Sequence, residues 1–477
     1  MKLESIRNNM APKIHNVTGI SHNYSVHFNW DNCKCCNMCT TACTFGVLTK
    51  SAPKHPPFIT PNREKLTVEN TETTRVMIQE SDCVSCGQCS NACNFKAITV
   101  MGYEDKIAAA KAAGKKVVAM IAPSTRVGIS EFMGQPFGVA SMAQLVSCLR
   151  KIGFDYVFDV NFGADQTTLD DYSEIIELKE QGKGPAFTSC CPGWIELMEK
   201  EYPQLIPHIS TAKSPTATLA SMIKNGWAKD MGLKPEDVFT VGIMPCVAKK
   251  TECERHQLHD DYNASITTKE LADMFKAKLS KEDCTFTPEK EAALSQTEEG
   301  QCDLPFRMMS GGANIFGKTA GVAETVLRVI ALSKHVKWED CKITTEEIFK
   351  HAASGSACTK ITFNCDGLIL TGAVCHGGFA IRKCCDMILA GELNVDVVEM
   401  MACVGGCING GGQPKILPKN KALAVKRVER LDALDHENAI KVASENTDLS
   451  KWMKEHMGDE KVHHELLFTN YEARYKK

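Results

Sequence analysis

Cysteine occurs at three points of the sequence where an apolar run ends in a tight loop. Cys191, Cys246, Cys403 and Cys407 stand in these loops. The apolar runs before them cover residues 186–187, 238–244 and 395–400. Loops at the carboxyl ends of strands are where open α/β sheets gather their ligands, and thiolates bind soft metals and iron–sulfur clusters. Four sulfur atoms are therefore available to converge on one iron–sulfur cluster.

Two runs near the N-terminus have a second pattern, C-x2-C-x2-C-x3-C, which is typical of bacterial-type ferredoxins. In those proteins the fourth cysteine of each run ligates the cluster of the other run. We therefore expect two 4Fe-4S clusters here. One set of ligands is Cys33, Cys36, Cys39 and Cys93, and the other is Cys83, Cys86, Cys89 and Cys43. Zinc also binds four thiolates, but two matched runs with the same tail favour clusters.

The remaining cysteines have no such spacing. The 24 cysteines among 477 residues are fewer than the roughly 8–10% that indicates a disulfide scaffold, so we read them as reduced. Free buried cysteine, which packs as a small apolar residue, is the expectation for eleven of them. These are Cys35, Cys148, Cys253, Cys284, Cys302, Cys341, Cys358, Cys365, Cys375, Cys384 and Cys385.

Apolar runs alternate with helical patterns through most of the chain, which predicts an α/β fold with mainly parallel sheets flanked by helices. Strands are expected at 117–121, 156–160, 186–187, 238–244, 264–267 and 395–400. Helices are expected at 105–115, 140–151, 170–180 and 269–279, and up to 332 after a glycine-rich turn at 311–317. The less regular parts predict a surface loop at 281–302, a mixed α/β insertion at 340–395 and surface helices after 429.

The residues around the central cysteines indicate how a metal pocket would be built. Cys403 and Cys407 are four residues apart, so a helical segment would place both sulfurs on one face. The glycines of the same motif would leave room for a bulky inorganic group. Met244 and Met401 would supply uncharged, polarizable walls. Lys249 is either a charged hydrogen-bond donor into the pocket or an exposed lysine.

Three motifs resemble the signatures of the iron-only (FeFe) hydrogenases. They are TSCCPGW at 188–194, MPCxxKxxE at 244–252 and ExMxCxxGCxxGGGQP at 399–414. The resemblance covers nearly the whole chain and implies a two-lobed large-subunit fold preceded by a small α+β ferredoxin-like domain. It also implies an H-cluster, which is a 4Fe-4S cubane joined to a two-iron subsite that carries carbon monoxide, cyanide and an azadithiolate bridge.

The resemblance assigns roles to individual residues around that cofactor. Cys407 matches the cysteine that bridges the cubane and the two-iron subsite, and the other three central cysteines match the remaining cubane ligands. Ser124, the backbone of Pro123 and Lys249 match the groups that hold the cyanides. The residues that match the lining of the two-iron pocket are Met244, Met401 and Phe316.

Proton delivery is a further role that the resemblance implies. Cys190, beside a ligand in sequence, matches the first proton donor, and a thiol can carry protons near a metal. Behind it the family uses two glutamates and a serine. Glu174 and Ser210 match, whereas the inner glutamate falls on Asp171, one methylene shorter. Proton transfer needs a contact of about 2.6–3.2 Å or one bridging water, so we expect an added water or a slower relay.

By this resemblance the chain is a ferredoxin hydrogenase that interconverts protons and electrons with dihydrogen. Its expected partners are a soluble ferredoxin and hydrogenase maturation proteins. The alternative is a hydrogenase-like iron–sulfur cluster assembly factor without turnover. In that group the doubled cysteine and the eight front cysteines are typically lost, whereas both features are present here. A sensory relative would carry a fused signalling domain, and we recognise none in the sequence.

Size and charge set the remaining expectations. The formal net charge is -3, with a sequence pI near 6.5, which argues against nucleic acid as a partner. No apolar run approaches the roughly 18 residues of a membrane span. We expect a cytoplasmic protein, or one in an anaerobic organelle such as a hydrogenosome if the N-terminus is a presequence.

The expected parts are an N-terminal extension (1–30), a ferredoxin-like domain (31–104), an H-cluster domain (105–414) and a C-terminal helical segment (415–477) that resembles the family's small subunit.

Overall fold

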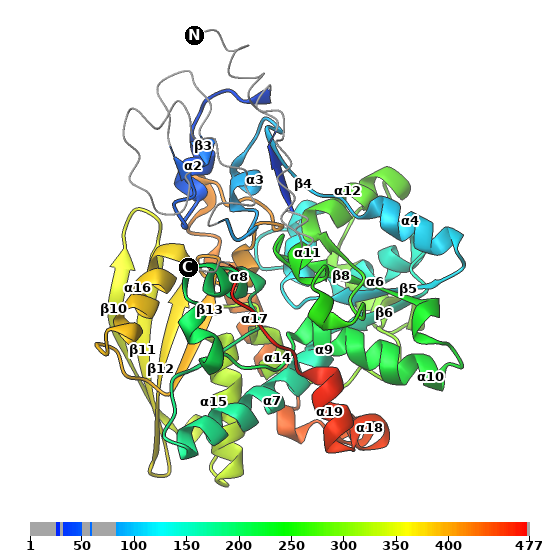
Figure 1. Cartoon of the computed structure of the whole chain (residues 1–477). Coiled ribbons are helices and arrows are strands. Elements are labelled where there is room, and N and C mark those ends of the chain that lie inside the picture. The colour runs from blue at the N-terminus through cyan, green and yellow to red at the C-terminus, as the bar shows by residue number, and fades with distance from the viewer. Residues whose placement is uncertain (1–24, 29–31, 50–57, 60–82, 475–477) are drawn as a thin grey trace.

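The computed structural model describes residues 25–28, 32–49, 58–59 and 83–474 (Figure 1). Most of the expected N-terminal extension, and much of the segment between the two cysteine runs, lies outside the described residues. Two lobes stand side by side, each built on its own sheet, and the cysteine runs sit at one end of them. No helix within the described ranges combines the length and apolar character needed to span a bilayer.

The first lobe is built on a four-stranded sheet of order β6-β5-β8-β9, in which each neighbouring pair is parallel. Its strands are β5 (Lys116–Ile121), β6 (Tyr156–Asp159), β8 (Val238–Met244) and β9 (Ala264–Thr267). All residues of β5 after the first are buried, as expected of a parallel strand covered on both faces. The surrounding helices are α4 (Glu104–Ala112), α5 (Thr125–Phe132), α6 (Met142–Lys151), α9 (Pro215–Met222) and α12 (Thr268–Lys278).

The second lobe is built on a five-stranded sheet of order β10-β11-β12-β13-β7. The strands β10 (Lys342–His351), β11 (Ser356–Cys365) and β12 (Leu368–His376) form an antiparallel meander, and β13 (Val397–Met401) and β7 (Ala186–Phe187) continue the sheet in parallel. The α/β fold class is confirmed. The expected insertion at 340–395 is the meander together with α16 (Gly378–Leu389), which packs on its three strands. The helices α8 (Pro192–Glu201) and α15 (Gly321–Ser333) both contact β13 of the same sheet.

Helix α7 (Val160–Glu180) links the two lobes, packing on α9 in one lobe and on α15 in the other. It begins ten residues before the expected helix at 170–180. Asp159 explains the early start, because its side chain accepts a hydrogen bond from Asn161 N and so caps the helix. The same carboxylate forms a buried ion pair of 2.8 Å with Arg126. Residues 161–165 are therefore helical.

The two cysteine runs fold alike. Each passes through left-handed residues, Cys35 and Asn37 in one run and Ser85 and Gly87 in the other, and then enters a short helix. The helices are α2 (Met38–Ala42) and α3 (Gln88–Ala92), and the strands beside them are β1 (Val26–Phe28), β2 (Leu48–Thr49), β3 (Phe58–Ile59) and β4 (Ile98–Val100). β1 pairs with β4 and β2 with β3, both antiparallel.

The expected surface loop at 281–302 is wrong, because this segment contains α13 (Pro288–Leu294). Thr287 caps the helix, and the carboxylate of Glu291 accepts hydrogen bonds from Ala143 N and Gln144 N at the start of α6. The expected helix up to 332 is interrupted: α14 (Gly312–Ile315) ends before α15, and Ala320 between them has φ 71°.

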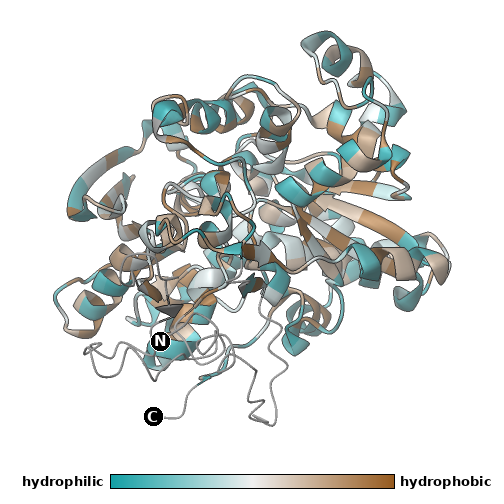
Figure 2. Ribbon diagram, turned by 90° about the horizontal axis from the view of Figure 1, so that it is seen from above, coloured by the Kyte–Doolittle hydropathy of each residue, from teal (hydrophilic) through white to brown (hydrophobic). Residues whose placement is uncertain are grey.

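The chain ends in α17 (Val425–Glu437), α18 (Thr447–Met457) and α19 (Glu460–Leu467). These helices bury apolar side chains against the lobes, including Leu431, Leu449 and Leu467. Arg427 of α17 forms a buried ion pair of 2.6 Å with Glu131 of α5. Figure 2 shows the corresponding pattern, with hydrophobic residues concentrated on interior strands and hydrophilic residues on outer helices. The short helices α10 (Ala228–Asp230) and α11 (Lys249–Glu252) complete the fold.

Candidate metal centres

The three cysteine loops meet between the two lobes. β7 and β13 are neighbours in one sheet, whereas β8 belongs to the other. Cys191, Cys246 and Cys403 all lie close enough to Cys407 that their charges raise its pKa, after the larger effect of burial. The structure therefore brings the four predicted central ligands together from three segments that are far apart in the sequence.

Three of these four thiols are buried, and Cys407 is partly buried. Cys191, Cys246 and Cys403 are 8%, 8% and 6% exposed. Burial is the main cause that raises the pKa of Cys403 to about 11, and it raises the pKa of Cys191 and Cys246 as well. Thiols in such a place bind a metal only by releasing their protons, because the thiolate is the ligand.

The segment that carries Cys403 and Cys407 is not an α-helix, so this part of the sequence interpretation is wrong. Gly405 and Gly406 have φ of 80° and 94°, and a short 3-10 turn, Cys407–Asn409, follows them. A left-handed pair suits glycine, which lacks the Cβ that makes this region costly for other residues. The two sulfurs are brought together by a tight turn instead of by helical periodicity.

The glycines of this motif do not clear space for an inorganic group as expected. A Cβ on Gly410 would lie 2.3 Å from Pro245 O, and one on Gly411 would lie 2.3 Å from Cys86 O. On Gly412 it would meet Thr267. Protein atoms occupy these positions, so the glycines allow three protein segments to approach the loop that holds Cys407.

Cys190 faces an apolar group formed by Phe316, Met401, Ala164, Ala313 and Val322. Met401 is the last residue of β13, and Phe316 lies in the break between α14 and α15. Glu399 holds these two elements together, because its buried carboxylate accepts hydrogen bonds from Ala320 N at 2.6 Å and Ala323 N at 2.9 Å. Glu399 stands inside the third motif, but the spacing of the motif carries no signal for this bridging contact.

Lys249 is buried, which excludes the exposed-lysine interpretation. Its Nζ donates a 2.8 Å hydrogen bond to Ser214 Oγ and forms a 2.6 Å ion pair with Glu252. Despite burial, Glu252 together with the nearby Cys190 and Cys246 raises the pKa of Lys249. A permanent positive charge is therefore held beside the central cysteines. Ser214 and Glu252 position it, and only Glu252 lies within a motif.

Ser124 and Pro123 lie at the end of β5, and both are buried. The hydroxyl of Ser124 has no hydrogen-bond partner among the described residues, while its backbone oxygen accepts a 2.8 Å hydrogen bond from Gln413. A buried hydroxyl without a partner is costly, so this atom is free for a polar ligand. Met244, at the end of β8, accepts a 3.5 Å contact from Thr216 Oγ1.

Asp171, Ser210 and Glu174 form a continuous chain of hydrogen bonds. Ser210 Oγ lies 2.6 Å from Asp171 Oδ1 and 2.6 Å from Glu174 Oε2. A hydroxyl has one proton, so it donates to one carboxyl group and accepts from the other only if that group is protonated. Burial is the main cause that raises the pKa of Asp171 to about 8. Asp171 is thus the protonated member at neutral pH.

Glu174 is half-buried and anchored at the outer end of this chain, where it accepts hydrogen bonds from Thr211 N. At the inner end, the charge of Asp171 raises the pKa of Cys190 after burial does. No hydrogen bond joins Cys190 to Asp171 among the described contacts, and Asp171 Oδ2 is buried without a partner. Asp171 has one methylene fewer than the glutamate expected at this position, and the missing hydrogen bond is the one on its Cys190 side.

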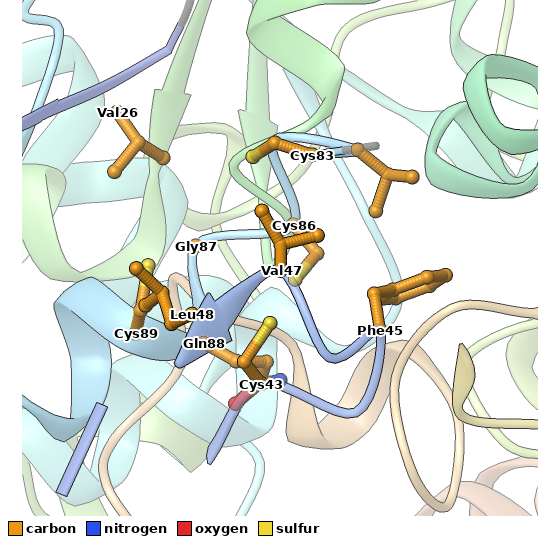
Figure 3. Close-up of a pocket in the computed structure, with 11 residues that line it drawn as sticks. Val26, Cys43, Phe45, Val47, Leu48, Cys83, Cys86, Gly87, Gln88 and Cys89 are labelled. Atoms are coloured by element: carbon orange, nitrogen blue, oxygen red, sulfur yellow. The ribbon is translucent and has the colours of Figure 1, made fainter. Parts of the chain in front are cut away.

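The eight front cysteines separate into two groups in the crossed arrangement expected. One pocket is lined by Cys43, Cys83, Cys86 and Cys89, which surround it in Figure 3. A second pocket is lined by Cys33, Cys36, Cys39 and Cys93. In both runs a backbone N–H points at the first sulfur: Cys35 N lies 3.3 Å from Cys33 Sγ, and Ser85 N lies 3.5 Å from Cys83 Sγ.

Gln88 connects the front to the central cysteines. Its Nε2 donates to Cys403 Sγ at 3.3 Å and to Asn409 O at 2.8 Å. Cys86, one of the cysteines around the pocket of Figure 3, has its pKa raised by burial and then by Cys403. The spacing of the motifs gave no signal for this contact, because it joins residues 315 positions apart.

The spacing of the twelve predicted ligands fits polynuclear clusters. A zinc ion binds sulfur at about 2.3 Å, so two of its ligands are at most about 4.6 Å apart. Within the described residues, no three of these twelve cysteines have their sulfurs within 4.8 Å of one another. A single zinc ion therefore fits none of the three sets as they stand, whereas a larger cluster has room.

Residues 115–411 match the family model of the iron-only hydrogenase large subunit, C-terminal domain. The chain belongs to the iron-only hydrogenase family. It is 32% identical to iron hydrogenase 1 of Clostridium pasteurianum over 79% of this chain and 64% of that protein, so it spans less than two thirds of that relative. It is 35% identical to the periplasmic Fe hydrogenase large subunit of Nitratidesulfovibrio vulgaris, over 63% of this chain and 69% of that protein.

Two further similarities bear on function. The solved structure of an apo FeFe-hydrogenase HydA1 variant from Chlamydomonas reinhardtii superposes with a TM-score of 0.62 at 31% identity, covering 77% of this chain and 98% of that one. The cytosolic Fe-S cluster assembly factor narfl of Danio rerio is 28% identical over 75% of this chain and 87% of that protein. Family membership by itself therefore includes both hydrogenases and assembly factors.

Proposed function

We propose that this protein is a ferredoxin-dependent FeFe-hydrogenase that reversibly reduces protons to dihydrogen. The observation that carries the proposal is the acid chain behind Cys190. Asp171, Ser210 and Glu174 are linked by 2.6 Å hydrogen bonds and lead from the central cysteines towards a half-buried carboxylate. A proton route has a use in turnover, whereas an assembly factor has no step that consumes protons at that place.

The residues that would hold an H-cluster are Cys191, Cys246, Cys403 and Cys407, with Cys407 as the bridging ligand. When bound, this cofactor supplies the iron centre at which protons and electrons combine. Lys249 and Ser124 offer the two polar groups that fit its cyanides: a charged ammonium and a buried hydroxyl without a partner. The backbone of Pro123 would join them in holding the cyanides, and Met244, Met401 and Phe316 would line the rest of the pocket.

Cys190 would hand protons to the central site and be reprotonated from the acid chain. Asp171 carries a proton at neutral pH because burial raises its pKa to about 8. Ser210 passes the proton on by exchanging which carboxyl group it donates to, and Glu174 collects protons from the outer side. The short side chain of Asp171 leaves a gap to Cys190 that one bridging water would span.

Electrons would pass through two front 4Fe-4S clusters. Cys33, Cys36, Cys39 and Cys93 form the outer set, in which Cys36 is exposed and within reach of a redox partner. The inner set is Cys43, Cys83, Cys86 and Cys89. The hydrogen bond from Gln88, which stands between Cys86 and Cys89 in the sequence, to Cys403 Sγ supports electron transfer from the inner set to the central site. A soluble ferredoxin is the expected partner, hydrogenase maturation proteins would install the cofactor, and the expected location remains the cytoplasm or a hydrogenosome.

The second candidate function, a cluster-carrying assembly factor, is favoured by the similarity to narfl. It predicts iron–sulfur clusters at the cysteine sets but no two-iron subsite and no turnover. The doubled cysteine and the buried Lys249 beside it argue against this candidate. Cys190 and Lys249 would both act on the two-iron subsite, which a protein that carries only a cubane lacks.

One experiment separates the two functions. The chain is expressed with hydrogenase maturation proteins, purified without oxygen, and assayed for hydrogen evolution from reduced methyl viologen while its iron is counted. We expect turnover in proportion to iron loading. Full cluster loading without hydrogen evolution would instead support the assembly factor.

A further inference from the structure

Three cysteines of the second lobe lie close together outside the sites described so far. They are Cys358 on β11, Cys375 on β12 and Cys384 on α16. Their sulfurs all lie within 4.8 Å of one another, and Cys358 Sγ and Cys375 Sγ are 3.1 Å apart. Among the described residues, no other group of three potential ligands is as compact.

The fold holds this thiol triad, Cys358, Cys375 and Cys384, firmly in place. Cys358 and Cys375 are directly opposite each other in the antiparallel register of β11 and β12, and such pairs have their side chains on the same face of the sheet. Helix α16 packs on that face and places Cys384 next to Cys358 and Cys375. The three side chains are at most 1% exposed.

The triad differs from the twelve cluster ligands in its scale. Three sulfurs bound to one ion at about 2.3 Å must lie within about 4.6 Å of one another, which the triad nearly satisfies and the cluster sets do not. This spacing suits a single metal ion. The expectation that these three cysteines are independent buried residues misses their convergence, because they come from three separate elements.

The composition of the triad narrows the choice of ion. All three ligands are sulfur, and soft thiolates select Cu(I), zinc or iron–sulfur chemistry. Zinc requires a fourth ligand in a structural site, and among the described residues no carboxylate, imidazole or further thiol joins the group. His376 follows Cys375 on β12 and so belongs to the opposite face of the strand.

We propose that Cys358, Cys375 and Cys384 form a binding site for one thiophilic, three-coordinate metal ion of the Cu(I) class. Binding replaces the three thiol protons by the ion, so it needs no oxidant and releases protons. The ion would fasten α16 to the β11–β12 hairpin. β12 pairs with β13 through Cys375 and Met400, so the site braces the strand that ends at Met401.

The test uses the full chain with its iron–sulfur clusters loaded, without oxygen. One equivalent of Cu(I) is supplied from a bicinchoninate-buffered solution, unbound copper is removed, and copper and iron are counted. The variants are Cys384→Ala and, as a second probe on a strand, Cys375→Val. The matched control is Cys365→Ala, which removes a buried cysteine from β11 outside the triad. Iron content and circular dichroism verify that each variant is folded.

The wild type and Cys365→Ala should retain one copper per chain with unchanged iron, and X-ray absorption should show three sulfur neighbours. Losing a group that merely orients a metal ligand costs roughly 10–100-fold in affinity, so loss of a ligand should weaken binding by more than about 100-fold. Three results would overturn the proposal: equal retention by folded Cys384→Ala and Cys375→Val, preference for zinc over copper, or a Cys358–Cys375 disulfide in the untreated protein by mass spectrometry. Because the readout is copper and not hydrogen, failure of the hydrogenase proposal would leave this result intact.

Discussion

The N-terminal part with the two cysteine runs (the front, residues 33–93) and the central set of Cys191, Cys246, Cys403 and Cys407 (the centre) position their cysteines in opposite ways. The front sets come from two short runs and are partly open to solvent: Cys36 is exposed, and only Cys39 of the eight is buried. The central set comes from three distant loops, and three of its four cysteines are buried. The difference fits the two tasks that we propose, since the front would exchange electrons with a partner at the surface, whereas the centre would carry out proton chemistry away from bulk water.

The two regions also differ in what fixes their geometry. In the front, left-handed residues within each run set the spacing locally, and the same backbone conformation appears twice. In the centre, β7, β8 and β13 must all be in place before the sulfurs meet. A local site tolerates changes elsewhere in the fold, but an assembled site does not.

The largest effect is expected from removing a ligand of the central set. Cys246→Ala should abolish hydrogen evolution with either ferredoxin or methyl viologen as the donor, because the chemical site loses a ligand. Cys36→Ser, which removes an exposed ligand of the outer set, should reduce ferredoxin-driven evolution much more than viologen-driven evolution. The measurement is hydrogen by gas chromatography with both donors. Equal losses for the two variants with both donors would contradict the division of labour.

The proton donor gives the next effect. Cys190→Ser should lower hydrogen evolution by roughly 10²–10⁴-fold, the range for removal of a positioned proton donor, while iron content stays unchanged. Cys148→Ser, a buried cysteine of the first lobe, is the control and should keep its activity. Persistent turnover in the Cys190 variant would remove this residue from the proton route.

Asp171 links the proton route to stability. Its pKa is raised from 3.8 to about 8, mainly by burial, so the folded protein binds the proton more tightly than the unfolded chain does. The free energy of unfolding should therefore fall as pH rises from 3.8 to about 8. Asp171→Asn has no such proton, so its stability relative to the wild type should improve with rising pH.

Thermal unfolding of both proteins at pH 6 and at pH 8 measures this difference, and a constant difference would show that Asp171 titrates normally. Asp171→Asn should also lower hydrogen evolution, whereas Asp171→Glu, which restores the missing methylene, should keep the acid and retain activity.

The smallest effect tests the junction between the two regions. Gln88→Ala removes the hydrogen bond to Cys403 Sγ, and hydrogen bonds to ligand sulfurs help to set cluster potentials. The reduction potential of the adjacent cluster should become more negative, and hydrogen evolution should change only a few-fold because the net worth of one hydrogen bond is about 0.5–1.5 kcal/mol. Asn91→Ala, which loses a bond to Gln413 O instead, is the control for a merely structural effect.

Much of the fold could be predicted from the sequence because the parallel strands are continuous apolar runs. β8 has the predicted bounds, and β5, β6 and β9 differ from theirs by one residue or none. The same pattern gave no warning of the antiparallel meander at β10 to β12, because periodicity does not reveal which strands pair. The start of α7 was also missed, since its cap depends on Asp159.

The candidate site was predictable where spacing carries information and unpredictable where contact decides. The C-x2-C-x2-C-x3-C runs and the three cysteine loops identified every residue that we propose as a cluster ligand. Their roles as ligands remain proposals. Ser214, Gln88 and the thiol triad could not be found this way, because each depends on residues brought together from distant segments. The burial of Lys249 likewise became clear only from the packing around it.

The front packs closely against the loop of Gly410, Gly411 and Gly412, and this contact limits how much of the N-terminal part could be deleted. Gly411 lies against the backbone at Cys86, and Gln88 covers the sulfur of Cys403. A shortened chain that starts at α4 would open that sulfur to water and to oxygen. A shortened variant would therefore need a replacement segment that covers Cys403 in place of the removed N-terminal part.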